Sequence, residues 1–421
     1  MNVLILGSGG REHALAYKIS QSPLLNDLYI FPGNAGTETL GKNLNLHTDF
    51  ATIARKCIDF SINIIVVGPE VMLVSGIKDF FKRMVGLQHI KVVGPDKAAA
   101  MLEGSKSFAK KFMNTYNIPT AGYFAVNKKN KDEGLRFLEQ QQAPFVLKAD
   151  GLAAGKGVII CDTKEEATAN LEDMLSGKFG KASKTVLIEE FLQGTEISVF
   201  ILTDGKSYKL LPNAKDYKRA GEKNTGLNTG GMGAVSPVPF AGKALMNKIK
   251  EQIIEPTICG IKDSKMVYEG FLYFGLMIVN NDPYVIEYNV RMGDPEAEVV
   301  LPRIESDLLQ HLNAACTQSI DKEELKIDKR AAATVILASG GYPEKYEKGK
   351  TISGTDIVKK SMIFHAGTKT DNGNIITNGG RVMALTSFGK NIKQALKRSY
   401  AAAKMVNFDN KYYRKDIGFD L

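Results

Sequence analysis

The sequence predicts a chain of several domains, α/β and α+β in class, that begins with a doubly wound parallel sheet. In its first hundred residues, short β-branched runs that stop at Gly, Pro or Asn alternate with amphipathic stretches. Further along, apolar runs come in pairs around glycine-rich turns, which is typical of hairpins. The final stretch is rich in strands and glycine turns. We therefore expect an N-terminal domain over 1–103, a second domain over 104–328 and a small strand-rich α+β domain over 329–421.

Composition favours an enzyme of the cell interior. The chain has 421 residues, of which 44% are hydrophobic and 24% charged, so it can bury several real cores. Its four cysteines are far apart and form no C-x-x-C pair, which indicates a reducing compartment. The first apolar run is too short for a signal peptide, and no run approaches transmembrane length. We expect a cytoplasmic protein without a membrane partner.

The net charge of +9 raises the possibility of nucleic-acid binding. However, the basic residues are dispersed, and the densest run, Lys128–Lys131, has no interleaved aromatic residues. We therefore expect no nucleic-acid partner. The excess charge is either an ordinary solvated surface or a feature that suits phosphorylated substrates.

The N-terminal strands are predicted to be "NVLILG", "LYIFP", "NIIVVG" and "IKVVGP". In a parallel sheet the loops at the carboxyl ends line the ligand crevice, so loops 8–11, 33–37 and 68–70 should meet at one edge. The first loop, "GSGGRE", has Glu12 where the dinucleotide fingerprint needs its third glycine. This favours a phosphate at a helix N-terminus over a dinucleotide, and a tight turn kept for packing is the alternative.

From Met101 the sequence predicts one helix, closed by Asn117 and Pro119, and then two strands around the loop "DGLAAGKG". This loop is similar to a Walker A motif, but its glycine spacing is short and Gly157 replaces the Ser or Thr. A strand also follows the loop where a P-loop needs a helix. The pattern favours a flexible flap over a nucleotide's phosphates, with Lys148 on the incoming strand, and a plain hairpin is the alternative.

The next strand pair, "TVLIEEFLQGTEISVFIL", turns around Gly194. Its acids Glu189 and Glu190 lie near a strand end, where they either border an adenine or ribose or form a solvated pair. The segment 214–237 is then a long glycine-rich, cationic loop. Loops of this length are usually functional or disordered, and we expect one that closes on anionic substrates.

The stretch "VIEYNVRMGDPE" places Glu287, Asn289 and Arg291 at two-residue spacing. Side chains alternate faces on a strand, so these three should share one face, and Ile286, Tyr288 and Val290 should share the other. Carboxylate and amide oxygens suit Mg²⁺, and an adjacent Arg suits an anion that the metal also touches. The pattern favours a metal–nucleotide site, with a half-exposed strand as the alternative.

Taken in order, the motifs resemble the phosphoribosylamine–glycine ligase (glycinamide ribonucleotide synthetase) family of the ATP-grasp superfamily. The matching motifs are "GSGGREHALA", "PGNAGT", "VVGPE", "LEGSK", "KADGLAAGKGV", "IEEFL", "NTGGMGA", "RMGDPE", "GGYP", "FHAGT", "TNGGRV" and "RKDIG". The resemblance implies an ATP-grasp domain with a mobile flap subdomain at about 122–190. It also implies that ATP, with Mg²⁺ or Mn²⁺, joins glycine to 5-phosphoribosylamine through glycyl phosphate. The products are glycinamide ribonucleotide, ADP and phosphate, in purine biosynthesis, and the enzyme is expected to be a monomer or weak dimer.

The same resemblance implies the site residues. ATP would be bound by Lys106, Lys148, Gly155, Lys156, Gly157, Glu189, Glu190, Phe191, Leu192 and Glu196. Glu287 and Asn289 would bind the metal, and Arg291, Asp216 and Lys218 would be catalytic, with Asp216 at the glycine ammonium. The substrates would be bound by Gly9, Gly10, Asn34, Thr37, Glu70, Arg219, Gly293 and Asp294.

Four positions depart from the family pattern. Lys215 and Tyr217 stand where Gln and His are usual, Leu227 where Pro is usual, and Met292 where Phe is usual. The competing classes are a nicotinamide oxidoreductase, which would need the third glycine of the fingerprint, and a related carboxylate–amine ligase of purine synthesis.

Overall fold

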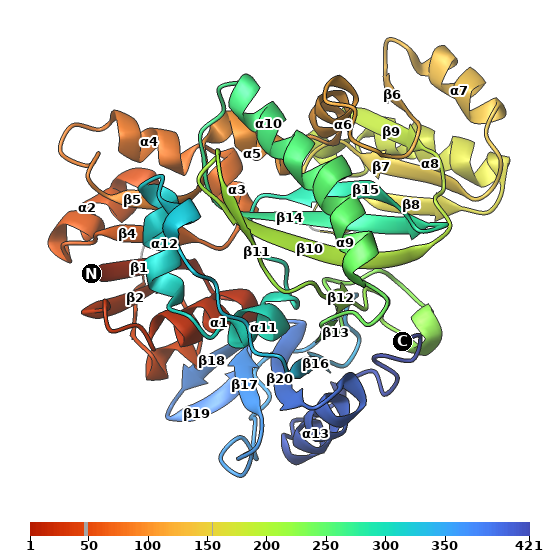
Figure 1. Ribbon diagram of the computed structural model, residues 1–421. Coiled ribbons are helices and arrows are strands. Elements are labelled where there is room, and N and C mark those ends of the chain that lie inside the picture. The colour runs from red at the N-terminus through yellow and green to blue at the C-terminus, as the bar shows by residue number, and fades with distance from the viewer. Residues whose placement is uncertain (46–48, 154) are drawn as a thin grey trace.

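The computed structural model describes residues 1–45, 49–153 and 155–421. Figure 1 shows a mixed α/β molecule in which a long central sheet carries one protruding lobe and one smaller domain below. The nine-stranded central sheet runs in the order β11-β10-β14-β5-β4-β1-β2-β3, with β15 also paired to β14. The predicted multidomain α/β and α+β class is confirmed.

The N-terminal part of the central sheet is parallel. Its strands are β1 (Asn2–Gly7), β2 (Asp27–Pro32), β3 (Lys42–Asn43), β4 (Ile64–Val67) and β5 (Lys91–Pro95). Val3 and Ile5 pack in the core shared with α1 (Gly10–Ile19), whereas Leu4 and Leu6 pack in the core on the opposite face. That opposite core includes residues of α2 (Phe50–Asp59), α4 (Ile77–Arg83) and α5 (Lys97–Gly104), and the short α3 (Glu70–Val74) precedes α4. Helices on both faces confirm the doubly wound arrangement.

The antiparallel half of the same sheet is here called the platform. It consists of β10 (Thr195–Thr203), β11 (Tyr208–Leu210), β14 (Tyr268–Val279) and β15 (Asp282–Asn289). β14 joins it to the N-terminal strands, because Tyr268 and Glu269 pair with Pro95 and Gly94 of β5. The helices around the platform are α9 (Lys243–Ile249), which continues through a π turn (Lys250–Ile254) into α10 (Glu255–Asp263), and α11 (Ala297–Val300) and α12 (Leu308–Cys316).

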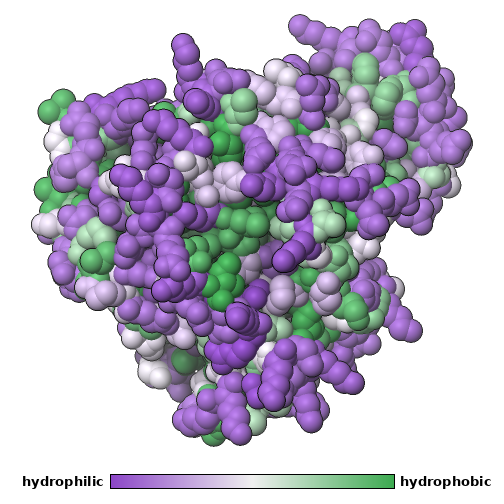
Figure 2. All heavy atoms as spheres, viewed as in Figure 1, coloured by the Kyte–Doolittle hydropathy of each residue, from purple (hydrophilic) through white to green (hydrophobic). Residues whose placement is uncertain are grey.

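A separate four-stranded antiparallel sheet forms the flap subdomain. Its order is β6 (Tyr123–Asn127), β9 (Thr185–Glu189), β7 (Phe145–Ala149) and β8 (Val158–Cys161), with α7 (Lys131–Glu139) and α8 (Lys164–Ser176) packed on it. The subdomain has its own apolar core, and Figure 2 shows it as a lobe with a largely hydrophilic surface at the upper right. Residue 154, inside the predicted flap loop, lies outside the described residues.

The single helix predicted from Met101 is wrong. The chain forms two helices, α5 and α6 (Lys106–Thr115), separated by Ser105 in an extended conformation (φ −145°, ψ 116°). The Ser105 hydroxyl accepts a hydrogen bond from the Phe108 amide and so caps α6. The same hydroxyl donates to the Asp150 carboxylate at 3.0 Å. This break places Lys106 at the start of α6, beside the end of β7.

The C-terminal domain has a six-stranded sheet in the order β12-β13-β16-β20-β17, with β21 paired to β16. Its strands are β12 (Lys215–Asp216), β13 (Gly233–Ser236), β16 (Ala331–Ser339), β17 (Met362–His365), β20 (Arg381–Gly389) and β21 (Lys411–Tyr412). A hairpin of β18 (Thr368–Asp371) and β19 (Asn374–Thr377) and the helix α13 (Ile392–Met405) complete it. The predicted loop 214–237 is therefore not wholly irregular, because its two ends are strands of this sheet.

No helix in the described ranges is long and apolar enough to cross a membrane. All four cysteines are free, and two of them, Cys57 and Cys161, are buried.

Candidate active site

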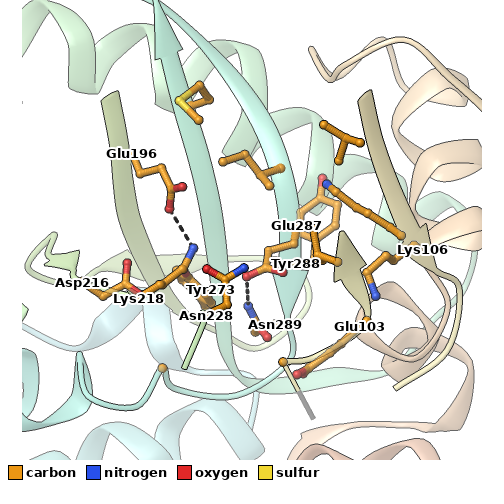
Figure 3. Close-up of a pocket in the computed structure, with 18 of the residues that line it drawn as sticks. Glu103, Lys106, Glu196, Asp216, Lys218, Asn228, Tyr273, Glu287, Tyr288 and Asn289 are labelled. Carbon is orange, nitrogen blue, oxygen red and sulfur yellow. Dashed lines mark hydrogen bonds and ion pairs between the residues drawn. The ribbon is translucent and has the colours of Figure 1, made fainter. Parts of the chain in front are cut away.

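A cavity of about 890 Å³ lies between the flap sheet and the platform. Residues of β7, β8 and β9 line it on the flap side, and residues of β10, β14 and β15 line it on the platform side. The segment after β12 and the loop after β15 also contribute to its wall. Figure 3 shows Glu287 and Asn289 between Asp216 and Lys218 on one side and Lys106 and Glu103 on the other. The structure thus brings most of the predicted site residues into one enclosure.

The floor of the cavity contains a β-bulge that the sequence pattern did not predict. Glu287 pairs with Gly275, but Leu276 pairs with Val285, which leaves Ile286 as the extra residue. A bulge rotates neighbouring side chains out of strict alternation. Ile286 therefore lines the cavity together with Glu287, and its predicted place on the opposite face is wrong.

Glu287 and Asn289 form a pair suited to a divalent metal. The Asn289 amide lies 3.5 Å from Glu287 Oε1. Burial disfavours the charge on Glu287, but Lys218, Lys106 and Lys148 together lower the pKa of its carboxyl below the ordinary value. An ionised carboxylate beside an amide oxygen is a hard donor set, which fits Mg²⁺ or Mn²⁺. The described residues contain no cluster of three or more His, Cys, Asp or Glu side chains that could hold a metal. A metal held by Glu287 and Asn289 would take its other ligands from phosphate and water oxygens, as Mg²⁺ commonly does.

Arg291 lies beyond the end of β15 and lines the same cavity. Its Nη2 is 2.8 Å from Glu103 Oε1, and its Nε is 3.4 Å from Glu70 Oε2. The buried Nε makes no hydrogen bond among the described residues, and its nearest acceptor is the Glu70 carboxylate of this ion pair. Burial raises the pKa of Glu103 to about 7, although the Arg291 charge opposes the shift. Glu70, which was predicted to bind substrate, therefore forms an ion pair with Arg291, the predicted catalytic residue.

The flap strand β7 and the helix α6 supply buried cations. Lys148 Nζ lies 2.8 Å from Glu189 Oε2, and Lys110 Nζ lies 3.2 Å from the same oxygen. Lys106 Nζ donates to the Ala149 carbonyl at 3.0 Å. Burial lowers the pKa of Lys106, whereas the Glu287 carboxylate acts against this shift. Lys110 was missed by the sequence reasoning because it reads as an ordinary polar residue on a helix, although it is 2% exposed.

The predicted adenine hinge, Glu189–Leu192, connects the flap strand β9 to the platform strand β10. All four of these residues line the cavity. The apolar lining nearby is contributed by Met113, Ala121, Val146, Ile160, Met277 and Ile286. The Glu190 amide donates to the Gly122 carbonyl at 2.9 Å, so the two chain segments that connect the flap to the platform are bonded to each other.

Asp216 and Lys218 lie across the cavity from the flap. Lys218 Nζ is 2.7 Å from Glu196 Oε2. Burial opposes the charge on Lys218, but Asp216 and then Glu196 raise its pKa well above the ordinary value. Burial raises the pKa of the Asp216 carboxyl above its ordinary value, while the Lys218 ammonium beside it favours the ionised form. Arg219, which follows, donates to the Gly226 carbonyl at 2.8 Å and also lines the cavity.

The glycine-rich flap loop is only partly directed at the cavity. Gly155 and Gly157 line it, but Lys156 is exposed and does not. Gly155 has φ +75°, a left-handed conformation that glycine adopts without strain, and open space surrounds the position of a Cβ. The Gly157 carbonyl accepts a hydrogen bond from the Ala149 amide at 2.7 Å, which anchors the end of the loop.

The loops that follow β1, β2 and β4 meet at one sheet edge, as predicted. The Gly9 amide donates to Glu12 Oε2 at 2.6 Å, so Glu12 caps α1 with its own carboxylate. A Cβ added at Gly68 would lie 2.0 Å from Glu12 Oε1, so the same side chain fills the space beside the third loop. In this structure the Gly9 amide is therefore bonded to a buried carboxylate of its own loop.

Asn34 and Thr37 hold the second loop together. Asn34 Nδ2 donates to the carbonyls of Ser8 and His365, both at 2.8 Å, and its Oδ1 accepts from the Gly36 and Thr37 amides. Thr37 is fully buried, and its hydroxyl bonds within the loop. Thr37 and Gly10 line neither of the two cavities described in this section.

A second cavity, of about 780 Å³, lies between these N-terminal loops and the C-terminal domain. Gly9 and Asn34 line it on one side, and residues 366–370 and 378–379 on the other. Asp294 and Arg381 line both cavities, and Gly293 lines the first. Arg381 Nη1 lies 3.0 Å from Asp294 Oδ1 and donates to the Gly230 carbonyl at 2.6 Å. The sequence reasoning quoted the motif "TNGGRV" but did not select its Arg.

Two antiparallel sheets face each other and enclose a cationic cavity, with Glu287 and Asn289 on its floor. This arrangement defines an ATP-grasp enzyme. Models of the phosphoribosylglycinamide synthetase family match the chain over residues 1–103 (N domain), 104–297 (ATP-grasp domain) and 332–420 (C domain). The chain belongs to the phosphoribosylglycinamide synthetase family.

Individual relatives agree with this assignment. A phosphoribosylamine–glycine ligase of Vibrio vulnificus is 45% identical over 426 residues, covering 100% of this chain and 98% of the relative. One from Haemophilus influenzae is 44% identical with the same coverage. The crystal structure of phosphoribosylamine–glycine ligase from Thermotoga maritima superposes with a TM-score of 0.86 at 35% identity, covering 99% of this chain and 100% of that one. A biotin carboxylase domain from Hydrogenobacter thermophilus, 16% identical with a TM-score of 0.73, shares the fold.

Proposed function

We propose that the protein is an ATP-dependent ligase that joins glycine to 5-phosphoribosylamine, giving glycinamide ribonucleotide, ADP and phosphate. One observation carries the proposal. A single cavity joins the lysines of the flap and of α6, the Glu287–Asn289 pair, the Arg291 guanidinium and the carboxylate of Asp216. These groups match a nucleotide phosphate, a divalent metal, a carboxylate and an ammonium, which are the charged parts of the ATP–glycine pair.

The nucleotide is proposed to lie between the flap sheet and the platform. The apolar lining around Ile286 and Met277 suits the adenine, and the Glu189–Leu192 hinge offers backbone groups at its edge. Glu196, on β10, suits a ribose hydroxyl. Lys106 and Lys148 lie toward the Glu287 end of the cavity, where their charges suit the phosphates. Mg²⁺ or Mn²⁺ bound at Glu287 and Asn289 would neutralise charge on those phosphates.

Glycine is proposed to bind with its ammonium at Asp216 and its carboxylate toward Arg291. Lys218 stays protonated because the neighbouring carboxylates raise its pKa, so its part is electrostatic. The phosphoribosyl part suits the second cavity, where Arg381 and Lys369 contribute positive charge and Asn34 shapes the wall. Since Asp294 and Arg381 line both cavities, the amine of the second substrate would reach the activated glycine past this pair.

The chemistry requires activation because an amine cannot expel oxide from a carboxylate. A glycine carboxylate oxygen attacks the γ-phosphorus, and the bond to the ADP oxygen breaks, which gives glycyl phosphate and ADP. The amine nitrogen then attacks the acyl carbon, loses a proton, and expels phosphate with the former carboxylate oxygen. Both steps develop negative charge on oxygens, which the oriented Arg291 guanidinium and the lysines would stabilise.

The test is turnover by the purified protein. ADP should form only when glycine, phosphoribosylamine and a divalent metal are all supplied, and ¹⁸O from labelled glycine carboxylate should appear in the released phosphate. Formate or bicarbonate in place of glycine separates the related purine ligases from this one. No ADP with the full mixture would contradict the assignment, and label absent from the phosphate would rule out the acyl phosphate. The free cysteines and the proposed pathway fit a cytoplasmic enzyme.

A further inference from the structure

A carboxylate of the C-terminal segment holds the part of the chain that carries Asp216 and Lys218. Lys215 Nζ lies 2.6 Å from Asp420 Oδ2. The Tyr217 hydroxyl donates to Asp420 Oδ1 at 2.8 Å. Lys215 is 6% exposed and Tyr217 is 1% exposed, so both contacts are shielded from water. Residues 215–218 all line the cavity, and Lys215 and Tyr217 are the two of them that contact Asp420.

Further contacts tie the same two segments together. The fully buried Arg414 guanidinium lies 5.4 Å from the centre of the Tyr217 ring and donates to the Arg219 carbonyl at 3.1 Å. The Asp416 carboxylate accepts from the Lys223 amide at 2.6 Å. The Tyr412 hydroxyl donates to the Ala220 carbonyl at 2.7 Å. The C-terminal segment 412–420 is therefore a backing for residues 215–223.

The strand that carries Asp216 is short. β12 has two residues, which pair with Val235 and Ala234 of β13. The ladder continues as backbone hydrogen bonds, from the Tyr217 amide to the Gly233 carbonyl at 3.0 Å and from the Met232 amide to the Tyr217 carbonyl at 2.8 Å. These bonds hold the backbone, and the Lys215 and Tyr217 side chains are both held by Asp420.

We propose that Asp420 is a positioning residue for glycine. By holding Lys215 and Tyr217 together, its carboxylate sets where Asp216 and Lys218 stand in the cavity. This inference rests on the proposed function, since it assumes that Asp216 receives the glycine ammonium. It also accounts for two of the four departures from the family pattern: Lys215 and Tyr217 act as a pair because one carboxylate accepts from both.

The first experiment compares steady-state constants for Asp420→Asn, Lys215→Gln and the double variant. Asp420→Asn should raise KM for glycine about tenfold, while KM for ATP changes less than about twofold. The double variant should regain part of the loss, because Lys215, with 8% of its side chain exposed, is then no longer an unpaired buried cation. Asp420 is 30% exposed at its side chain, so Lys215→Gln alone should have the smallest effect.

The outcomes separate positioning from other roles. Asp420 also lines the cavity, and if it bound glycine directly, the Lys215→Gln change would not rescue Asp420→Asn. An unchanged KM for glycine in Asp420→Asn would overturn the proposal. If Asp420→Asn does not fold, Tyr217→Phe removes only the hydroxyl contact and should raise the same KM. Asp409→Asn, an exposed carboxylate near the same segment, is the matched control and should leave both constants unchanged.

A second readout does not depend on the reaction. Amide hydrogen exchange of residues 215–220 in the nucleotide-free protein should be faster in Asp420→Asn than in wild type or Asp409→Asn. If wild type forms no ADP but this exchange difference is present, the proposed function has failed and the backing role stands. If wild type is active and the exchange rates are equal, the backing role is overturned.

Discussion

Arg291 Nη2 lies 2.8 Å from Glu103 Oε1, while its Nε remains a buried donor without a hydrogen bond among the described residues. The same Nε lies 3.4 Å from Glu70 Oε2, and Nη1 donates to the Met292 carbonyl at 3.1 Å. Two carboxylates and a carbonyl thus fix the orientation of the planar guanidinium, which a flexible Lys ammonium would not reproduce.

Arg291→Lys should therefore lower kcat while leaving nucleotide affinity nearly unchanged. Loss of one oriented donor to a developing oxyanion typically costs about 10²- to 10³-fold in rate. Single-turnover ADP formation and binding of a non-hydrolysable ATP analogue would measure the two quantities separately. A near-normal kcat would return Arg291 to a purely structural ion pair.

Glu287→Gln should weaken metal binding more than folding. The substitution keeps the shape of the side chain but removes the charge that a hard cation requires. Titration of Mg²⁺ or Mn²⁺ in the presence of an ATP analogue would report affinity, and thermal unfolding without metal would report the fold. A large drop in melting temperature in metal-free buffer would instead mark Glu287 as a structural strand residue.

The flap loop should exchange its amides quickly without nucleotide and slowly with it. Gly155 is in a left-handed conformation with open space around it, and Lys156 is exposed, so few contacts restrain the loop. Hydrogen exchange over 150–157 with and without an ATP analogue would test this, using the buried strand β7 as the internal reference. Strong and equal protection in both states would indicate a rigid turn.

The contact between the N-terminal and C-terminal domains should weaken in acid. The His365 amide donates to His13 Nδ1 at 2.8 Å, so this nitrogen must be unprotonated in the folded protein. Burial lowers the pKa of His13 to about 3 and that of His365 to about 4. In the unfolded chain both would titrate near 6.5, so the unfolded state binds more protons below that pH, and stability is lost as the pH falls from about 6.5 toward 4.

Urea unfolding midpoints at pH 7.5 and 5.0 would measure this acid effect. The double variant His13→Gln, His365→Gln should show a smaller difference between the two midpoints than wild type. His89→Gln, at an exposed position, is the control and should keep the wild-type difference. Equal differences in all three proteins would show that other groups control the acid response.

The sequence predicted the parts of the fold whose patterns are local. The four parallel strands were visible because each is a short β-branched run that ends in a turn residue. The helix break at Ser105 was not visible, because it involves a hydrogen bond from Ser105 to the distant Asp150 carboxylate. The strands β12 and β13 were missed for a similar reason: two to four residues carry no periodicity, and β13 joins the sheet through β16, about a hundred residues away.

The site residues also divide into those with a local sequence signal and those that depend on distant contacts. Glu287 and Asn289 were found because their spacing is a strand signal, and the bulge that adds Ile286 to the same wall depends on how β14 pairs with β15. Lys110 and Arg381 could not be selected from spacing, because each acquires its role from elements far along the chain. Glu12 was noticed as a defect in a glycine fingerprint, but only the structure shows that its carboxylate accepts a hydrogen bond from the Gly9 amide.

The pairing of β14 with β5 has a mechanical consequence. Tyr268 and Glu269 extend the N-terminal sheet without interruption into the platform, and the Lys78–Glu269 ion pair, at 2.7 Å, locks the joint. These two parts therefore form one continuous sheet. The flap is connected to it through the two segments 119–122 and 190–194, so the flap is the part that we expect to move. The distance between the two cavities would then stay the same whether the flap is open or closed. Closure would move the flap groups around the nucleotide without changing how glycine and phosphoribosylamine are aligned.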